Sequence, residues 1–354
     1  MKLRSISLVN FRNLRALKLS PAAQLNVIFG ANASGKTNLC ESIYYVAKGL
    51  LLKGDRQRDL ITWGCDSSVL CLETERDQLI VCLNGSEQSK GIEINAEKKR
   101  QSDLYEYLRV LIFTPEDLQI INGSPSRRRR FLDRSLCDLK PDLRYLLFEY
   151  DQLVQRKNAL LRSGRFDRDL LDVFNQELIE KGAQIVAARI EYLHQLNGFL
   201  KEAYARLTGE QKALQLRYEA HHDLSADMKR IRGLDSLYEE CSRIKAALTE
   251  LLEQIAIEEE RRGFALIGPH RDDIVIELDG LDVRRFGSHG EQKSCVIAIK
   301  LAQMELQKRV FEEYPILIMD DVLSELDSSR TELLLNNLPV STQIFLTVTE
   351  LTDA

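Results

Sequence analysis

A ten-residue stretch, FGANASGKTN from Phe29 to Asn38, contains the residue types that bind phosphate. Two glycines frame four residues and Lys-Thr follows, which is the spacing of a phosphate-binding loop. Glycine lets the backbone turn so that its N–H groups point at phosphate oxygens, while the lysine reaches the β- and γ-phosphates and the threonine hydroxyl ligates Mg²⁺. The pattern predicts a site for a nucleotide and Mg²⁺ built by Gly30, Ala31, Asn32, Ala33, Ser34, Gly35, Lys36, Thr37 and Asn38.

The flanking residues fit this interpretation. LNVIF at 25–29 is a short apolar run typical of a buried strand, and TNLCESIYYVAKG after the loop predicts a helix ending at Gly49. Strand, loop and helix would place the phosphates at a helix N-terminus, where the helix dipole favours anions. This context disfavours the alternative of a glycine-rich turn with an incidental lysine.

A second stretch, PILIMDDVLSELD at 315–327, supplies carboxylates. Four apolar residues followed by Asp320 predict a carboxylate at the end of a buried strand, where phosphate-loop ATPases hold Mg²⁺. Asp321 could orient the water that attacks the γ-phosphate. Many buried strands end in an acidic turn, but the position after the phosphate loop and the following SELD favour the functional interpretation.

A third stretch, FGSHGEQKSC at 286–295, comes before an amphipathic helical pattern. Ser288 is a suitable helix cap, and small residues expose backbone N–H groups. Two interpretations stay open: a capped helix start, or a second phosphate-binding helix N-terminus formed by Ser288, Gly290, Glu291 and Gln292.

Composition limits the class of protein. The chain has 354 residues and a net charge of -5, so any polyanion site must be a local patch. Seven cysteines without a C-x-x-C pair indicate a reducing cytosol, and the histidines lack zinc spacing. No apolar run approaches the ~18 residues of a membrane span, and the N-terminus lacks a signal-peptide core. We therefore expect a cytoplasmic protein with no membrane partner.

Periodicity divides the chain into three parts. Residues 1–123 are rich in short alternating strands, residues 124–263 repeat apolar residues at helical spacing, and strand patterns return in 264–354. We expect one α/β ATPase domain, with its signature and Mg²⁺ motifs in the C-terminal part, interrupted by a helical insert domain.

The helical part begins with SPSRRRR, and residues 121–170 hold twelve Arg and Lys against seven Asp and Glu. Such a local excess favours sequence-independent contacts with DNA phosphates through Arg127, Arg128, Arg129 and Arg130. The alternative is that these arginines form ion pairs within the chain. LIGPHRDD at 266–273 leaves a similar choice, because His270 could be catalytic or a structural strut.

In combination, these motifs resemble an ABC-type ATPase head. Their amino-acid sequences resemble the RecF family along essentially the whole chain. The segments that carry the resemblance are NFRNL at 10–14, GANASGKTNLCESIYY at 30–45, FTPEDLQIINGSPSRRRRFLD at 113–133, LIGPHRDD and DDVLSELD at 320–327. Ala33 stands where glycine is common and Asp321 where transporter relatives use Glu. The last strand has no switch histidine, with Thr347 and Thr349 as the nearest polar candidates, so we expect slow hydrolysis.

The resemblance implies a mixed sheet with flanking antiparallel strands and a helical insert, and an ATP molecule sandwiched between two chains. It implies catalytic roles for Lys36 and Asp321, Mg²⁺ ligation by Thr37 and Asp320, and further nucleotide contacts from Arg12 and Asp327. It also implies a weak, DNA-stimulated ATPase whose ATP-dependent homodimer clamps DNA at single-strand gaps and duplex junctions. RecR would be a partner, with RecO and RecA in the same pathway of repair, replication and SOS induction. A soluble transporter ATPase and a head-type nuclease are the alternatives.

Overall fold

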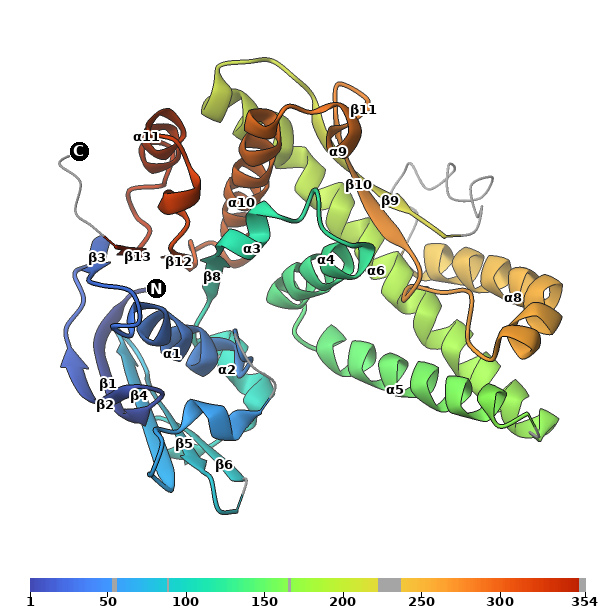
Figure 1. Cartoon of the computed structure of the whole chain (residues 1–354), viewed down its shortest axis with the longest axis horizontal. Coiled ribbons are helices and arrows are strands. Elements are labelled where there is room, and N and C mark those ends of the chain that lie inside the picture. The colour runs from blue at the N-terminus through green and yellow to red at the C-terminus, as the bar shows by residue number, and fades with distance from the viewer. Residues whose placement is uncertain (53–55, 88, 165–166, 222–236, 350–354) are drawn as a thin grey trace. The chain divides into compact units, whose positions relative to one another are not determined.

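The structure is a computed structural model that describes residues 1–52, 56–87, 89–164, 167–221 and 237–349. The chain forms two compact units (Figure 1). Unit 1 comprises residues 1–119, 206–209 and 293–354, and unit 2 comprises residues 120–205 and 210–292. Within the described residues, no helix is long and apolar enough to cross a membrane.

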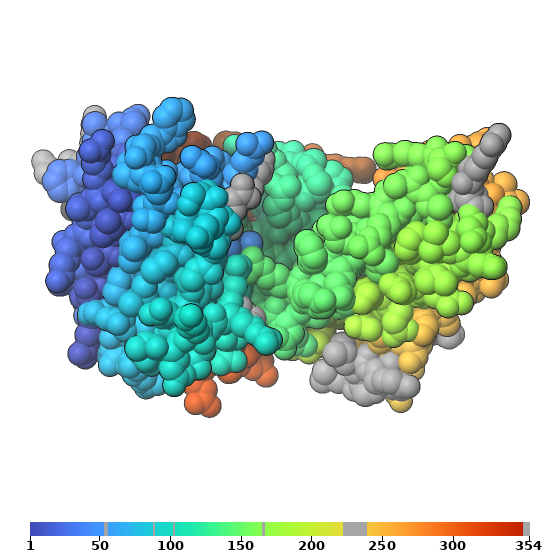
Figure 2. Space-filling view, turned by 90° about the horizontal axis from the view of Figure 1, so that it is seen from below, coloured from blue at the N-terminus to red at the C-terminus, as the bar shows by residue number. Residues whose placement is uncertain are grey.

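Unit 1 contains a six-stranded antiparallel sheet. Its strands are β1 (Leu3–Phe11), β2 (Leu14–Leu19), β4 (Ser67–Thr74), β5 (Gln78–Asn84), β6 (Ser89–Ile94) and β7 (Glu97–Lys98), in the order β2-β1-β4-β5-β6-β7. Alternating apolar residues bury one face of the central strands, as the period-2 pattern predicts. In the space-filling view of Figure 2, the N-terminal part of unit 1 forms the blue and cyan surface.

A four-stranded parallel sheet holds the chemistry-bearing segments of unit 1. Its order is β3 (Leu25–Phe29), β13 (Ile344–Val348), β12 (Ile316–Asp320) and β8 (Val110–Phe113), so strands from both ends of the chain lie side by side. Because the strands are parallel, the residues that follow β3, β12 and β13 meet at one edge. This pairing confirms the expectation that the two ends of the chain build one α/β domain.

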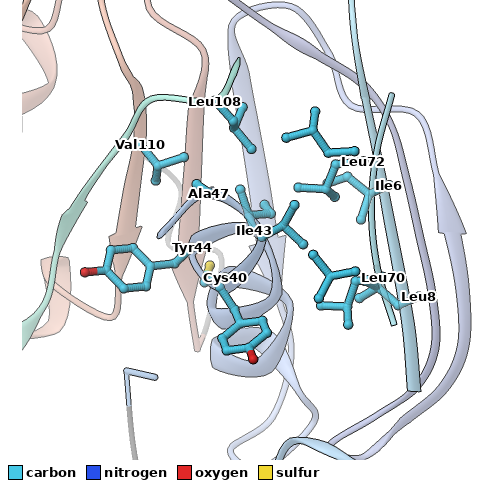
Figure 3. Packing of buried hydrophobic residues seen from close by; sticks show 14 of the residues in the cluster. Ile6, Leu8, Cys40, Ile43, Tyr44, Ala47, Leu70, Leu72, Leu108 and Val110 are labelled. Atoms are coloured by element: carbon cyan, nitrogen blue, oxygen red, sulfur yellow. The ribbon is translucent and has the colours of Figure 1, made fainter. Parts of the chain in front are cut away.

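Helix α1 (Lys36–Lys48) packs between the two sheets and fixes the phosphate loop that comes before it. Figure 3 shows Ile43 lying toward Leu8 and Leu70 of the antiparallel sheet, with Tyr44 on the side of Val110 from β8. The apolar residues of α1 and both sheets form one buried cluster. The loop is therefore anchored at both ends by elements of the main core.

Short helices complete unit 1. These are η1 (Gln57–Leu60), η2 (Gln101–Asp103), α2 (Leu104–Tyr107), α3 (Pro115–Leu118), η3 (Leu323–Glu325) and α11 (Ser328–Asn336). Helix α3 begins with Pro115, and Thr114 with Asp117 forms a capping box there.

Unit 2 contains the helices α4 (Pro125–Leu139), α5 (Leu143–Arg162), α8 (Leu237–Arg262) and α9 (Val283–Phe286) and most of α6 (Arg168–Thr208). It also contains a three-stranded antiparallel sheet of β9 (Leu214–Glu219), β10 (Asp273–Leu278) and β11 (Leu281–Asp282), in the order β11-β10-β9. The hairpin turn between β10 and β11 falls at Asp279-Gly280, where both residues have positive φ angles, of 51° and 79°.

The expected boundary at 263/264 differs from the structure. Residues 264–292 belong to unit 2, since β10 pairs along its length with β9 from the helical part of the chain. The sequence pattern missed β9, whose partner lies about sixty residues further along the chain. Helix α10 (His289–Phe311) then leads from unit 2 into unit 1.

Candidate nucleotide-binding site

The phosphate loop turns tightly at Gly35, the residue immediately before α1. Gly35 has a φ of 103°, and a Cβ there would lie 2.8 Å from Asn13 Oδ1, so no other residue fits without displacing Asn13. Asn13 donates from Nδ2 to the Ala33 carbonyl at 3.2 Å and accepts from Asn38 Nδ2 at 2.8 Å. The β1–β2 turn thus supports the loop from outside, a role that no motif in the sequence indicated.

Ala33, the departure from the usual glycine, has a φ of 65°. A left-handed conformation costs an L-residue about 1–2 kcal/mol, so the loop carries this cost at one position. Lys36 Nζ donates to the carbonyls of Gly30 and Ala31, at 2.7 and 3.0 Å. The ammonium therefore lies over the turn that would hold the phosphates.

Asp320 and Thr37 form the predicted Mg²⁺ pair. Thr37 Oγ1 lies 3.0 Å from Asp320 Oδ1, although the two residues are 283 positions apart in the chain. A hydroxyl and a carboxylate are hard oxygen ligands of the kind Mg²⁺ takes beside phosphates and water, so the donor set fits the ion. Both residues follow from sequence reasoning, and the structure brings them together.

Thr347 of β13 contacts the same carboxylate. Its Oγ1 donates to Asp320 Oδ1 at 2.9 Å and accepts the backbone N–H of Asp321 at 2.8 Å. The residue is buried. Of the two polar candidates, Thr347 lies in β13 and is bonded to Asp320, whereas Thr349 follows the end of the strand.

Asp321 has a φ of 55°, a left-handed conformation that Asp and Asn adopt more readily than other non-glycine residues. This conformation is a physical reason for Asp rather than the longer Glu at this position. A cavity of about 140 Å³ opens at this edge of the parallel sheet, lined by Asn32, Ala33, Gly35, Lys36, Thr37, Asn38, Asp321, Thr347 and Thr349. Sequence-predicted residues from both ends of the chain therefore share one cavity.

Arg12 and Asp327 hold local structure in unit 1. Arg12 pairs bidentately with the buried Glu41 of α1, with both distances 2.9 Å, and donates to the Asp59 carbonyl at 3.0 Å. Asp327 caps α11 by accepting the Arg330 N–H at 2.9 Å. Direct nucleotide contacts of both residues stay predictions.

The residues expected to form the signature motif, Ser288, Gly290, Glu291 and Gln292, lie in unit 2, and Ser288 and Glu291 form a capping box at the start of α10. Ser288 donates from its backbone N–H and from Oγ to Glu291 Oε2, each at 2.9 Å, and the Glu291 N–H donates to Ser288 Oγ at 3.3 Å. The Lys212 ammonium and the Ser288 donors hold the pKa of Glu291 down at about 2. Gln292 Oε1 accepts from Asn122 Nδ2 at 2.6 Å. The expected cap is confirmed, and Gly290 lies in the first turn of α10.

The arginine cluster is divided by the fold of unit 2. Arg128 is 3% exposed, pairs bidentately with Asp273 at 2.8 and 2.6 Å, and donates to the Gly123 carbonyl. Arg129 donates to the Asp272 carbonyl at 2.9 Å. Burial lowers the pKa of Arg129. For Arg128 and Arg129, these contacts favour the alternative that the arginines pair within the chain rather than with DNA. Arg127 and Arg130 are exposed.

His270 lies inside unit 2. Its Nδ1 is 2.9 Å from the hydroxyl of Tyr150, and burial lowers its pKa to about 4. The neighbouring Pro269 carbonyl accepts from Arg189, which is paired bidentately with Asp133. These contacts favour the structural alternative for GPHRDD over a catalytic histidine.

Comparisons with known proteins agree with this arrangement. The family model described as RecF/RecN/SMC N terminal domain matches residues 2–352. The DNA replication and repair protein RecF of Geotalea daltonii is 36% identical over 357 residues, covering 99% of this chain and 94% of the relative. Two solved structures of the recombination mediator protein RecF in the RecFOR pathway are similar over 99% of the chain and 93% of their own. The one with ATPrS has a TM-score of 0.86 at 26% identity, and the one with ATP 0.82 at 27%.

Proposed function

The chain belongs to the RecF family, and we propose that it is an ATP-dependent DNA-binding protein of replication and repair that uses weak ATP hydrolysis as a conformational switch. Its fold is the ATPase head of that family, a mixed α/β unit with an insert of helices. The similar relatives are DNA replication and repair proteins, and two of the solved RecF structures contain ATP or ATPrS.

The observation that supports the nucleotide role most directly is the convergence of Lys36, Thr37 and Asp320. Thr37 comes from the helix after the phosphate loop and Asp320 from the end of β12, yet their oxygens lie 3.0 Å apart. When bound between them, Mg²⁺ would neutralise phosphate charge. Asp321, at the rim of the same cavity, is the proposed base or orienting group for water.

The proposed DNA contacts are Arg127 and Arg130, the two exposed members of the arginine cluster. Guanidinium groups in water bind phosphates without reading sequence. Arg128 and Arg129 have the different proposed role of holding the start of α4 against the 272–273 segment.

A homodimer with ATP in its interface is the proposed active form. The signature of one chain, at Ser288–Gln292, would close over the γ-phosphate held by the phosphate loop of a second chain. RecR is the proposed partner, with RecO and RecA in the pathway, because the similar solved structures are mediators of the RecFOR pathway.

Sedimentation velocity with ATP and gapped DNA tests this proposal. We expect the full chain to sediment as a DNA-bound dimer with ATP and as a monomer with ADP. Lys36→Ala should stay monomeric under both conditions, since it lacks the cation that reaches the β- and γ-phosphates. A wild-type chain that gives the same species with ATP, ADP and no nucleotide would contradict the switch.

A further inference from the structure

Trp63 is an exposed aromatic side chain without a role in the site described above. It is the only tryptophan of the chain, and it is 97% exposed. Large aromatic side chains normally bury most of their surface, so a ring presented this fully is unusual for a residue with only a structural role.

The backbone holds Trp63 at the corner of a tight turn. The Cys65 N–H donates to the Thr62 carbonyl at 3.0 Å, and Gly64, the third residue of the turn, has a φ of 84° that favours glycine. The turn lies between η1 and β4. Its geometry presents the indole to solvent on a defined backbone.

This turn is hydrogen-bonded to the segment that supports the phosphate loop. The Thr62 N–H donates to the Asn10 carbonyl at 2.9 Å, and the Arg12 N–H donates to the Leu60 carbonyl at 2.7 Å. One residue further along, Asn13 binds the Ala33 carbonyl inside the loop. Asn10 and Asn13 are three positions apart, and the β1–β2 turn begins between them, so one short segment is hydrogen-bonded both to the Trp63 turn and to the phosphate loop.

We propose that Trp63 is the platform on which the base of the bound nucleotide stacks. The inference rests on the proposed nucleotide site and adds its base-recognition residue. A purine covers more of an indole than a pyrimidine does, so Trp63 should also favour ATP over CTP.

The single tryptophan gives a direct test, because its fluorescence reports one residue. The full chain is titrated with ATP and with inorganic tripolyphosphate, and binding of each is measured separately by calorimetry. We expect both to bind and only ATP to quench the emission. ATP binding without a change in emission would overturn the platform and leave the phosphate site standing, as would an equal change with tripolyphosphate. No binding of either ligand would overturn the nucleotide site and the platform together.

Variants provide the second arm. Trp63→Ala should lower ATP affinity roughly five- to hundredfold, the range for loss of one stacked base, and should reduce the preference for ATP over CTP. Its affinity for tripolyphosphate should be unchanged. Trp63→Phe keeps a ring and should stay within about threefold of wild type. Ile257→Ala, at an 83% exposed residue of α8 in unit 2, is the matched control for removing an exposed apolar side chain. ATP affinity equal to wild type in Trp63→Ala would overturn the proposal.

Discussion

Thr347 donates a hydrogen bond from its hydroxyl to Asp320 at 2.9 Å, which links β13 of the parallel sheet to the carboxylate proposed to hold Mg²⁺. The same hydroxyl accepts the Asp321 N–H at 2.8 Å, so it orients both carboxylate residues. No histidine lies in this strand, and a short buried hydroxyl bridges the two residues.

Replacing Thr347 with Val should therefore impair hydrolysis more than nucleotide binding. The change keeps the shape of the side chain but leaves the Asp321 N–H without its acceptor, a loss of about 1–3 kcal/mol in the free energy of unfolding. Urea unfolding and ATP turnover measure the two effects. Thr347→Ser keeps the hydroxyl and should recover most of both. A Thr347→Val protein with wild-type turnover would remove Thr347 from the mechanism.

Asp321→Asn should bind ATP normally and lose hydrolysis. Asn tolerates the left-handed backbone at this position as Asp does, so the fold should be unaffected, but a neutral amide cannot take a proton from water. Lys36→Ala is the contrasting variant and should lose ATP binding itself. Calorimetry with ATP and a phosphate-release assay separate the two outcomes. Wild-type ATPase activity in Asp321→Asn would show that this carboxylate does not act on the water.

The phosphate loop, the two strand-end aspartates and the α/β character were predictable because each depends on residues that are adjacent in the sequence. A turn rich in glycine and an apolar run that ends in Asp carry their structure locally. The helix cap at Ser288 was predictable for the same reason, although its reciprocal bonds with Glu291 were not predicted.

Relationships that depend on the tertiary fold could not be obtained in this way. The support of the loop by Asn13 and the pairing of β9 with β10 join residues that are far apart in the chain, and no local pattern encodes their register. The burial of Arg128 was equally hidden, since SRRRR contains four identical side chains and only the direction of each on α4 separates Arg128 from the exposed Arg127 and Arg130.

The division of the arginine cluster gives a prediction for DNA binding. Neutralising Arg127 and Arg130 together should weaken binding to all sequences alike and flatten the slope of log K against log salt by about 0.9 per lost duplex contact. The stability of the protein should stay near wild type, because both side chains are exposed.

Arg128→Ala is the internal contrast. It leaves the Asp273 carboxylate without its partner and should lower the free energy of unfolding by about 3–5 kcal/mol. Salt titrations of DNA binding and urea unfolding measure both effects. An unchanged salt slope in the Arg127/Arg130 double variant would place DNA elsewhere on the molecule.

His270 should make stability depend on pH. Burial lowers its pKa to about 4 in the folded chain, whereas the unfolded chain binds a proton near its ordinary value of about 6.5. The contribution of the neutral His270 to stability is therefore full above about pH 6.5 and is lost as the pH falls toward 4, by up to about 3 kcal/mol.

His270→Gln, which keeps a polar group near Tyr150 but does not titrate, should lose less stability over the same interval. Urea unfolding of both proteins at several pH values gives the difference, in which the other titrating groups cancel. Parallel curves for the two proteins would mean that His270 is not held neutral by the fold.

The signature residues carry the prediction on which the switch depends. In a single chain, Ser288 and Glu291 complete each other as a helix cap, and the phosphate loop belongs to a different unit. The proposed anion for the N-terminus of α10 is the γ-phosphate held by a second chain, so ATP would form part of the interface and stabilise the dimer only while that phosphate is present.

Ser288→Arg puts a bulky side chain where the two chains would close. The variant should bind ATP as a monomer, because its own phosphate loop is unchanged, and should neither dimerise nor hold DNA in an ATP-dependent way. Ser288→Ala removes the cap without added bulk and should cost about 1 kcal/mol in stability while keeping part of the dimerisation. Mass measurement in solution with ATP decides between the models. If Ser288→Arg still dimerises with ATP, the residue is only a helix cap, and the γ-phosphate of a second chain is not its ligand.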